Sequence, residues 1–179
     1  MKTHFYDLRF RSYEWARIWV TSDGMISICS DYGNFGYWFG APAMEIRRFL
    51  VQADPGPGGY IAIKLSDGER AYDCEATLLE VKKYILDHRR SGDWDHERAR
   101  DEWELLRQNS WLGHRDEFHN WYLETKIDCA HEFFQDMLPG KVQGFMEHAW
   151  PVFVKAMKTE IAAEEARSAA FGIMQEMGV

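Results

Sequence analysis

The N-terminal third of the chain alternates apolar and polar side chains with the period of a β-strand. The segment 14–20 is the clearest case. Its residues Ala16, Ile18 and Val20 fall on one face, while the alternate residues, some of them tryptophans, fall on the other. A Thr-Ser-Asp-Gly turn follows, and residues 25–30 then alternate in the same way. The pattern therefore predicts a β-hairpin.

Two further segments extend this hairpin into an antiparallel meander. Residues 4–11 are mixed and aromatic and fit an edge strand, and residues 35–39 fit a strand that follows a turn at 31–34. A helix is predicted to begin near Pro42, where apolar residues start to recur at helical spacing. Residues 60–65 form a short apolar segment that fits either a helix or a strand.

Beyond residue 70 the apolar residues recur at helical spacing throughout. The fold class is therefore α+β, with an N-terminal antiparallel β-meander and one helix, followed by a mostly α-helical C-terminal part. The predicted division is residues 1–70 and an acidic helical region 71–179, and the two can also pack as one domain. Helices are predicted over residues 75–88, 93–108, 114–138, 142–150 and 151–174.

The net charge of −8 is confined to the second part of the sequence. Residues 1–70 hold eight basic and eight acidic residues, whereas residues 71–179 hold thirteen basic and twenty-one acidic residues. Binding to phosphates requires clustered Lys and Arg, so direct nucleic-acid binding is not expected. An acidic surface of this kind either keeps the protein in solution or docks on a basic site of a partner protein.

The cysteines and the hydropathy of the chain predict a cytoplasmic protein. Cys29, Cys74 and Cys129 are widely spaced and form no Cys-x-x-Cys pair, which is typical of a reducing compartment. The N-terminus has no apolar signal region, and no run approaches eighteen apolar residues. We therefore expect no association with a membrane.

Two Asp-x-x-His pairs are the strongest candidates for metal chemistry. They are Asp93 with His96 and Asp128 with His131, and Glu124 precedes the second pair by one helical turn. Residues three or four apart share a helical face, and carboxylate-bridged metal sites of helical bundles are built from such pairs. One hypothesis is thus a metal-dependent enzyme that uses Glu124, Asp128, His131 and His96. The alternative is a solvated polar face.

No standard catalytic motif is present in the sequence. It contains no Gly-x-Ser-x-Gly, no Gly-x-x-x-x-Gly-Lys and no Gly-x-Gly-x-x-Gly. No catalytic residue and no cofactor are therefore predicted, and a non-enzymatic function is favoured.

The aromatic residues after the predicted hairpin are candidates for partner binding. Tyr32, Phe35, Tyr37 and Trp38 cannot all face one side of a small sheet, so we expect Tyr32, Tyr37 and Trp38 to contribute to a surface. Such a surface binds a protein, stacks the bases of single-stranded nucleic acid, or is covered by the C-terminal helices. The acidic candidates for the same role are Asp93, Asp95, Glu97, Asp101, Glu102 and Glu104.

The turn and its trailing aromatic residues also carry a family resemblance. They read Ser-Asp-Tyr-Gly-Asn-Phe-Gly-Tyr-Trp over residues 30–38, followed by Ile-Arg-Arg-Phe-Leu at 46–50 and Tyr-Ile-Ala-Ile-Lys-Leu at 60–65. This combination resembles a family of small accessory proteins encoded in tailed-phage and prophage genomes, over residues 12–66. The resemblance implies an accessory gene product that is expressed in the cytoplasm of an infected bacterium, and it supplies no catalytic residue.

Three functions follow from these patterns. The first is a phage accessory protein that binds and modulates a host protein, for example a nucleic-acid-processing or defence complex, as an anti-CRISPR-like inhibitor does. The second is the metal-dependent enzyme described above. The third is a single-strand nucleic-acid binder that uses the aromatic face of the sheet.

Overall fold

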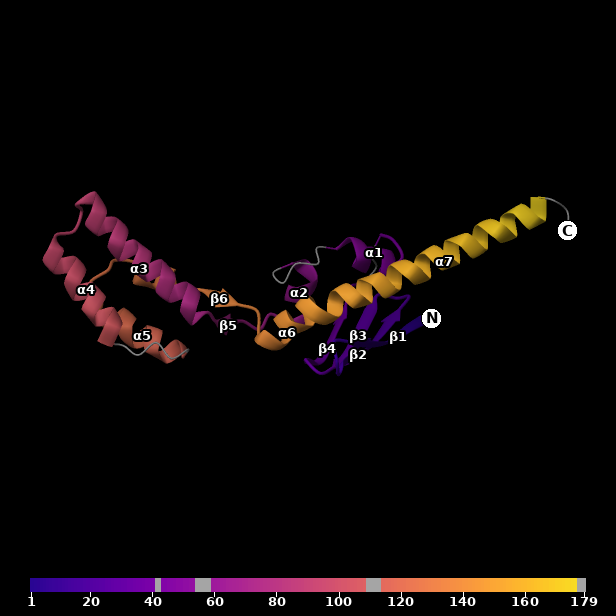
Figure 1. The fold of residues 1–179 in the computed structure, drawn as a ribbon, viewed down its shortest axis with the longest axis horizontal. Helices are drawn as coiled ribbons and strands as arrows, with labels where there is room; N and C mark the ends of the chain where they lie inside the picture. Colours follow the sequence, from indigo (N-terminus) through magenta and orange to yellow (C-terminus); the bar gives the residue numbers. More distant parts are fainter. Residues whose placement is uncertain (41–42, 54–58, 109–113, 177–179) are drawn as a thin grey trace. The chain divides into compact units, whose positions relative to one another are not determined.

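The computed structural model shows two compact units (Figure 1). The sheet unit comprises residues 1–69 and 138–179, and the helical unit comprises residues 70–137. The division predicted from the sequence assigns residues 138–179 to the helical part, whereas in the structure they belong with the sheet. The described ranges are 1–40, 43–53, 59–108 and 114–176, with side chains described as far as residue 171.

A four-stranded antiparallel sheet forms the first part of the sheet unit, which confirms the predicted meander. The strands are adjacent in the order of the chain, and each pairs with the next through a tight turn. β1 is an edge strand, as predicted. The strands are β1 (Thr3–Phe10), β2 (Glu14–Thr21), β3 (Met25–Ser30) and β4 (Gly33–Trp38).

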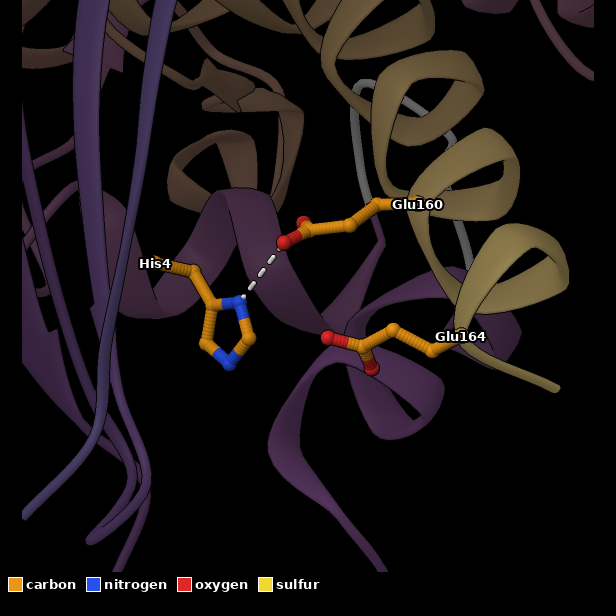
Figure 2. Close-up of side chains that lie close together, drawn as sticks. All are labelled: His4, Glu160 and Glu164. Atoms are coloured by element: carbon orange, nitrogen blue, oxygen red, sulfur yellow. Dashed lines mark hydrogen bonds and ion pairs between the residues drawn. The ribbon is translucent and has the colours of Figure 1, made fainter. Parts of the chain in front are cut away.

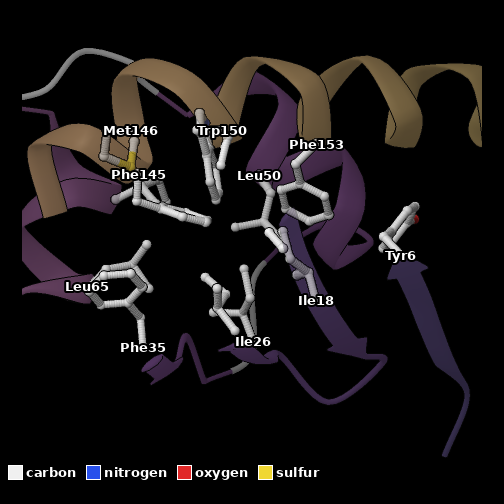
Figure 3. Packing of buried hydrophobic residues seen from close by; sticks show 14 of the residues in the cluster. Tyr6, Ile18, Ile26, Phe35, Leu50, Leu65, Phe145, Met146, Trp150 and Phe153 are labelled. Atoms are coloured by element: carbon white, nitrogen blue, oxygen red, sulfur yellow. The ribbon is translucent and has the colours of Figure 1, made fainter. Parts of the chain in front are cut away.

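Strand alternation places one face of the sheet, the inner face, against helices. The helices are α1 (Ile46–Gln52), α2 (Tyr60–Leu65) and α7 (Trp150–Glu176). Pro42, the predicted start of the first helix, lies outside the described residues, and residues 60–65 prove to be helical. Figure 3 shows the shared core, in which side chains from the sheet meet side chains from the helices. Its buried members include Ile18, Ile26, Leu50, Phe145, Trp150 and Phe153.

Residues 140–176 of the sheet unit are helical without interruption. α6 (Gly140–Gly144) leads into a single π-helical turn, η2 (Phe145–Ala149), which leads into α7. The last helix, predicted over residues 151–174, is present as α7, but it continues the preceding helical turns instead of beginning anew at Pro151, because Gly144, Phe145 and Trp150 all have right-handed helical backbone angles. A proline lacks the N–H that an α-helix needs, and a π turn just before it lets the chain continue as a helix.

The helical unit has its own core. Its helices are α3 (Cys74–Ser91), α4 (His96–Gln108), α5 (Arg115–Glu124) and the short 3₁₀ turn η1 (Ala130–Phe133), and its two short strands β5 (Ala71–Tyr72) and β6 (Asp136–Met137) pair antiparallel. Buried residues of this core include Val81, Ile85, Trp94, Phe118 and Trp121.

The helix predicted over residues 114–138 ends at Glu124, so that prediction is wrong in its second half. Glu102 of α4 explains the break. Its carboxylate accepts hydrogen bonds from the Thr125 hydroxyl at 2.6 Å and from the backbone N–H of Lys126 at 2.9 Å. The carboxylate of Glu102 thus accepts from the N–H of Lys126, which would bond within the helix if α5 continued. The helical spacing of apolar residues continues beyond this point, which is why the sequence predicts a longer helix.

Candidate functional site

The second face of the sheet, which we call the outer face, carries large apolar side chains that are exposed to solvent. It arises because every residue next to a core residue along a strand points away from the core. Its members are Thr3, Phe5, Asp7, Arg9, Trp15, Arg17, Trp19, Thr21, Met25, Ser27, Cys29, Asn34, Gly36 and Trp38.

Four of these residues, Phe5, Trp19, Met25 and Trp38, form what we call the aromatic patch. Their exposed fractions are 52%, 37%, 47% and 64%. Phe5 lies opposite Trp19 with ring centroids 5.2 Å apart, and Met25 lies opposite Trp38. Trp19 pairs with Ser27, two residues from Met25 on the same face, so the two pairs are diagonal neighbours. Contiguous exposed apolar surface of this kind marks interaction sites.

Trp38 is the most exposed member of the aromatic patch, and it is held in place. Its indole N–H donates a hydrogen bond to the backbone oxygen of Asp23, in the turn between β2 and β3, at 2.8 Å. A side chain that is already fixed in the free protein loses little conformational entropy when a partner covers it. Trp38 is therefore suited to act as an anchor for a partner.

The charges beside the aromatic patch are largely balanced. The guanidinium of Arg17 lies 3.7 Å from the carboxylate of Asp7 and 5.7 Å from the ring centroid of Trp15. Arg9 adds a second, exposed cation to the outer face. The patch thus has a polar border, with little net charge, around an apolar centre.

Of the three aromatic residues predicted at the surface, Trp38 lies in the aromatic patch and the other two contact the core. Tyr37 lies on the inner side of β4, half-buried, with its ring 4.9 Å from that of Phe39. Tyr32 is half-buried, and its hydroxyl donates to Glu14 at 2.9 Å. Of the three, Trp38 is thus the residue that is largely exposed.

The sequence analysis missed Phe5 and Met25. The alternation along the strands contains the signal for both. It places Tyr6 and Ile26 in the core, and therefore their neighbours Phe5 and Met25 on the outer face.

The six predicted acidic residues do not form one open face. Glu102 is buried and holds the end of α5, as described above. Glu104 forms an ion pair with Arg107 at 3.0 Å, and Asp95 accepts a hydrogen bond from the backbone N–H of Arg98 at 2.8 Å. A smaller acidic surface therefore remains at the start of α4. Its exposed members are Asp93, Asp95, Glu97 and Asp101.

The structure does not bring the predicted metal ligands together. His96 begins α4, Glu124 ends α5, Asp128 lies in the following turn, and His131 lies in η1. Because α5 ends at Glu124, Glu124, Asp128 and His131 do not belong to one helix, and helical spacing does not place them on one face. Within the described ranges, these four residues do not form a group of potential metal ligands.

A different group, His4, Glu160 and Glu164, lies in the sheet unit (Figure 2). His4 belongs to β1, and both glutamates project from α7. The His4 Nδ1 lies 3.0 Å from Oε1 of Glu160, and the Tyr6 hydroxyl donates a short hydrogen bond to the other oxygen of Glu160. One potential ligand atom from each member of the group lies within 4.8 Å of the others.

Arg47 supplies the positive charge of this group. Its guanidinium lies 3.4 Å from Glu160, 2.6 Å from Glu164 and 2.7 Å from Glu45, and Lys2 lies 3.0 Å from Glu164. A metal ion at the same carboxylates would be repelled by the guanidinium. We therefore interpret the cluster as an ion-pair network that fixes α1 and α7 to the edge of the sheet.

The network shifts the pKa of its acids. Hydrogen bonds from Arg47 and Lys2 lower the pKa of Glu164 to about 2. Burial raises the pKa of Glu160, but hydrogen bonds from Tyr6 and His4 outweigh burial, so the pKa of Glu160 falls below its ordinary value. Burial and the Glu160 contact raise the pKa of Tyr6, which keeps its hydroxyl protonated as a donor.

These shifts predict acid sensitivity of the sheet unit. A carboxyl group whose pKa is lower in the folded state stabilises the fold above the unfolded pKa, here 4.5, and loses this effect as the pH falls toward the folded pKa, about 2 for Glu164. We expect the melting temperature to fall between about pH 4.5 and pH 2. Circular dichroism melts across this range, with Glu164→Gln beside the wild type, test this. Identical pH profiles for the two proteins would contradict it.

Comparison with known protein families shows which family the chain belongs to. The sequence model of a phage family, Phage_phiTE_072, matches residues 1–169. The chain belongs to this phage family. The match confirms the resemblance to phage proteins and extends it from the N-terminal region to both units. No curated protein and no solved structure matches the chain. In the described part of this phage protein, no helix has the length and apolar character needed to cross a membrane.

Proposed function

We propose that this phage protein binds a host protein through the aromatic patch and modulates its activity without catalysis of its own. The observation that carries the proposal is the exposure of Phe5, Trp19, Met25 and Trp38 side by side on a sheet whose inner face is packed against helices. Tryptophan is enriched among the residues that dominate binding energy at protein interfaces, and an apolar centre with a polar border is typical of such interfaces.

The charge of the outer face favours a protein over single-stranded nucleic acid. Aromatic residues that stack bases usually lie in a groove lined by Lys and Arg, which tracks the phosphates. Here Arg17 is paired with Asp7, and Arg9 is the other cation of the outer face. This charge suits a polar rim rather than a phosphate track.

The helical unit supports a more specific choice of target. Residues 70–137 hold ten basic and sixteen acidic residues, a net charge of −6. Complementary charge increases association rates and selects partners, so a basic host surface fits this unit best. Nucleic-acid-processing and defence complexes in the bacterial cytoplasm present such surfaces, and we propose an anti-defence, anti-CRISPR-like inhibitor as the role of the protein.

Trp38→Ala is the variant that tests the aromatic patch. Loss of a tryptophan anchor from an interface costs about 2 kcal/mol, which corresponds to about a thirtyfold weaker affinity. The tagged protein is used to capture its partner from host lysate, mass spectrometry identifies the partner, and calorimetry on the two purified proteins measures the affinity.

The matched control is Tyr13→Ala. Tyr13 is an aromatic residue that is 92% exposed, between β1 and β2, outside the aromatic patch. Its replacement should leave the affinity within about twofold, because an isolated exposed side chain contributes little. Equal affinities for Trp38→Ala and the wild type, or no captured partner at all, would rule out the aromatic patch as the binding surface.

A further inference from the structure

A groove runs between α3 and α4 of the helical unit, with a volume of about 300 Å³. Ile85 and Ala99 are buried and form its floor, while Leu86 and Trp103 are exposed large apolar residues on its sides. The groove takes part in neither the aromatic patch nor the ion-pair network, which belong to the sheet unit. We call it the α3–α4 groove.

The charge along this groove differs from that of the unit around it. Arg89 and Arg100 line it, although acidic residues outnumber basic ones in residues 70–137. The carboxylate of Glu104, which also lines the groove, is already engaged by Arg107, with Arg107 Nη2 at 3.0 Å and Nε at 3.2 Å. Among the described residues, neither Arg89 nor Arg100 holds a carboxylate in a direct ion pair, although Arg100 adds to the larger effect of Arg107 in lowering the pKa of Glu104. The groove therefore combines an apolar floor with two guanidinium groups that can still pair directly with an anion.

We propose that the α3–α4 groove binds an acidic segment of a partner protein that carries a large apolar side chain. The apolar side chain would lie between Leu86 and Trp103, and the carboxylates would pair with Arg89 and Arg100. Guanidinium groups bind carboxylates in bidentate geometry, which adds strength and orientation.

The form of the groove favours a peptide over a small molecule. A pocket for a small ligand usually buries most of the ligand surface, whereas this groove is open to solvent along the two helices. A segment that presents one apolar face can fill such a groove while its other face stays in water. The positive rim selects an acidic segment among the possible peptides.

The test uses two fluorescein-labelled helical peptides of twelve residues. One contains only Leu, Trp and Glu, and its counterpart has Lys at every Glu position. In fluorescence polarisation with the full-length protein, we expect the Glu peptide to bind and the Lys peptide to bind at least about tenfold more weakly. The double variant Arg89→Glu/Arg100→Glu should weaken binding of the Glu peptide by about tenfold or more.

The control variant is Lys83→Glu/Arg90→Glu. It makes the same change of charge on exposed positions of α3 outside the groove, and should keep the wild-type affinity. Arg89→Gln/Arg100→Gln repeats the test without charge reversal, and circular dichroism confirms that each variant folds. Trp38→Ala should bind the Glu peptide normally, so the groove and the aromatic patch are tested separately.

Three results would overturn the proposal. The first is equal binding of the two peptides, and the second is unchanged affinity in both double-arginine variants. The third is binding of the small aromatic anion 8-anilinonaphthalene-1-sulfonate, lost in the double-arginine variants, together with no binding of the Glu peptide. The groove would then be a site for a small molecule and not for a peptide.

Discussion

Replacement of Arg47 by methionine is expected to lower the free energy of unfolding by about 3 kcal/mol. Arg47 is only 5% exposed, and its guanidinium contacts three carboxylates. The variant removes the central cation and leaves Glu160 and Glu164 close to each other without it. Loss of one partner from a buried ion pair is costly because the remaining charge stays desolvated, and partial exposure of the glutamates keeps the cost near the lower end of the usual range. Urea denaturation measures the change.

Arg48→Met is the matched control, since Arg48 follows in the same helix and also pairs with a glutamate of α7, Glu165. Both members of this pair are largely exposed, so we expect a change below about 1 kcal/mol. Similar losses in the two variants would show that the buried network has no special role in holding α7 to the sheet.

Gly24→Ala is expected to destabilise the sheet unit by about 3 kcal/mol. Gly24 lies in the turn between β2 and β3 with φ of +99°, a backbone conformation that strains any residue with a Cβ. A Cβ at this position would lie 2.4 Å from the backbone oxygen of Gly40. The backbone N–H of Phe39 donates to the Gly24 oxygen at 2.9 Å, so the clash cannot be relieved without loss of that hydrogen bond.

Gly68→Ala separates the two causes. Gly68 also has a positive φ, +77°, but no atom lies within 4 Å of the position of its Cβ. Gly68→Ala should therefore lower the free energy of unfolding only by the backbone strain, about 1 kcal/mol. Equal losses for Gly24→Ala and Gly68→Ala in urea denaturation would contradict a role for the contact with Gly40.

The sheet could be predicted from the sequence because its signal is local. Residues such as Ala16, Ile18 and Val20 alternate with outward-facing neighbours, and a glycine stands where the hairpin turn needs a positive φ. The same alternation shows Trp19 and Phe5 on the outer face, although it does not say whether that face is covered.

The features that could not be predicted depend on residues far apart in the chain. The helix after residue 114 ends early because Glu102 of another helix takes a donor at Lys126. The ion-pair network joins His4 to Glu160, which are 156 positions apart. Spacing within one segment contains no information about either contact. It could therefore suggest a metal site at Glu124, Asp128 and His131, which the described residues do not form, and it could not reveal the ion-pair network around Arg47.

The chain completes the sheet unit late. The inner face of the sheet is closed by residues that follow the whole helical unit, among them Leu138, Phe145, Trp150 and Phe153. When the four strands have been translated, much of the apolar inner face of the sheet is therefore still uncovered. The ribosome must translate the entire helical unit before α7, which covers that face, is made. In an infected cell, the nascent chain is vulnerable to aggregation, and open to chaperones, throughout that interval.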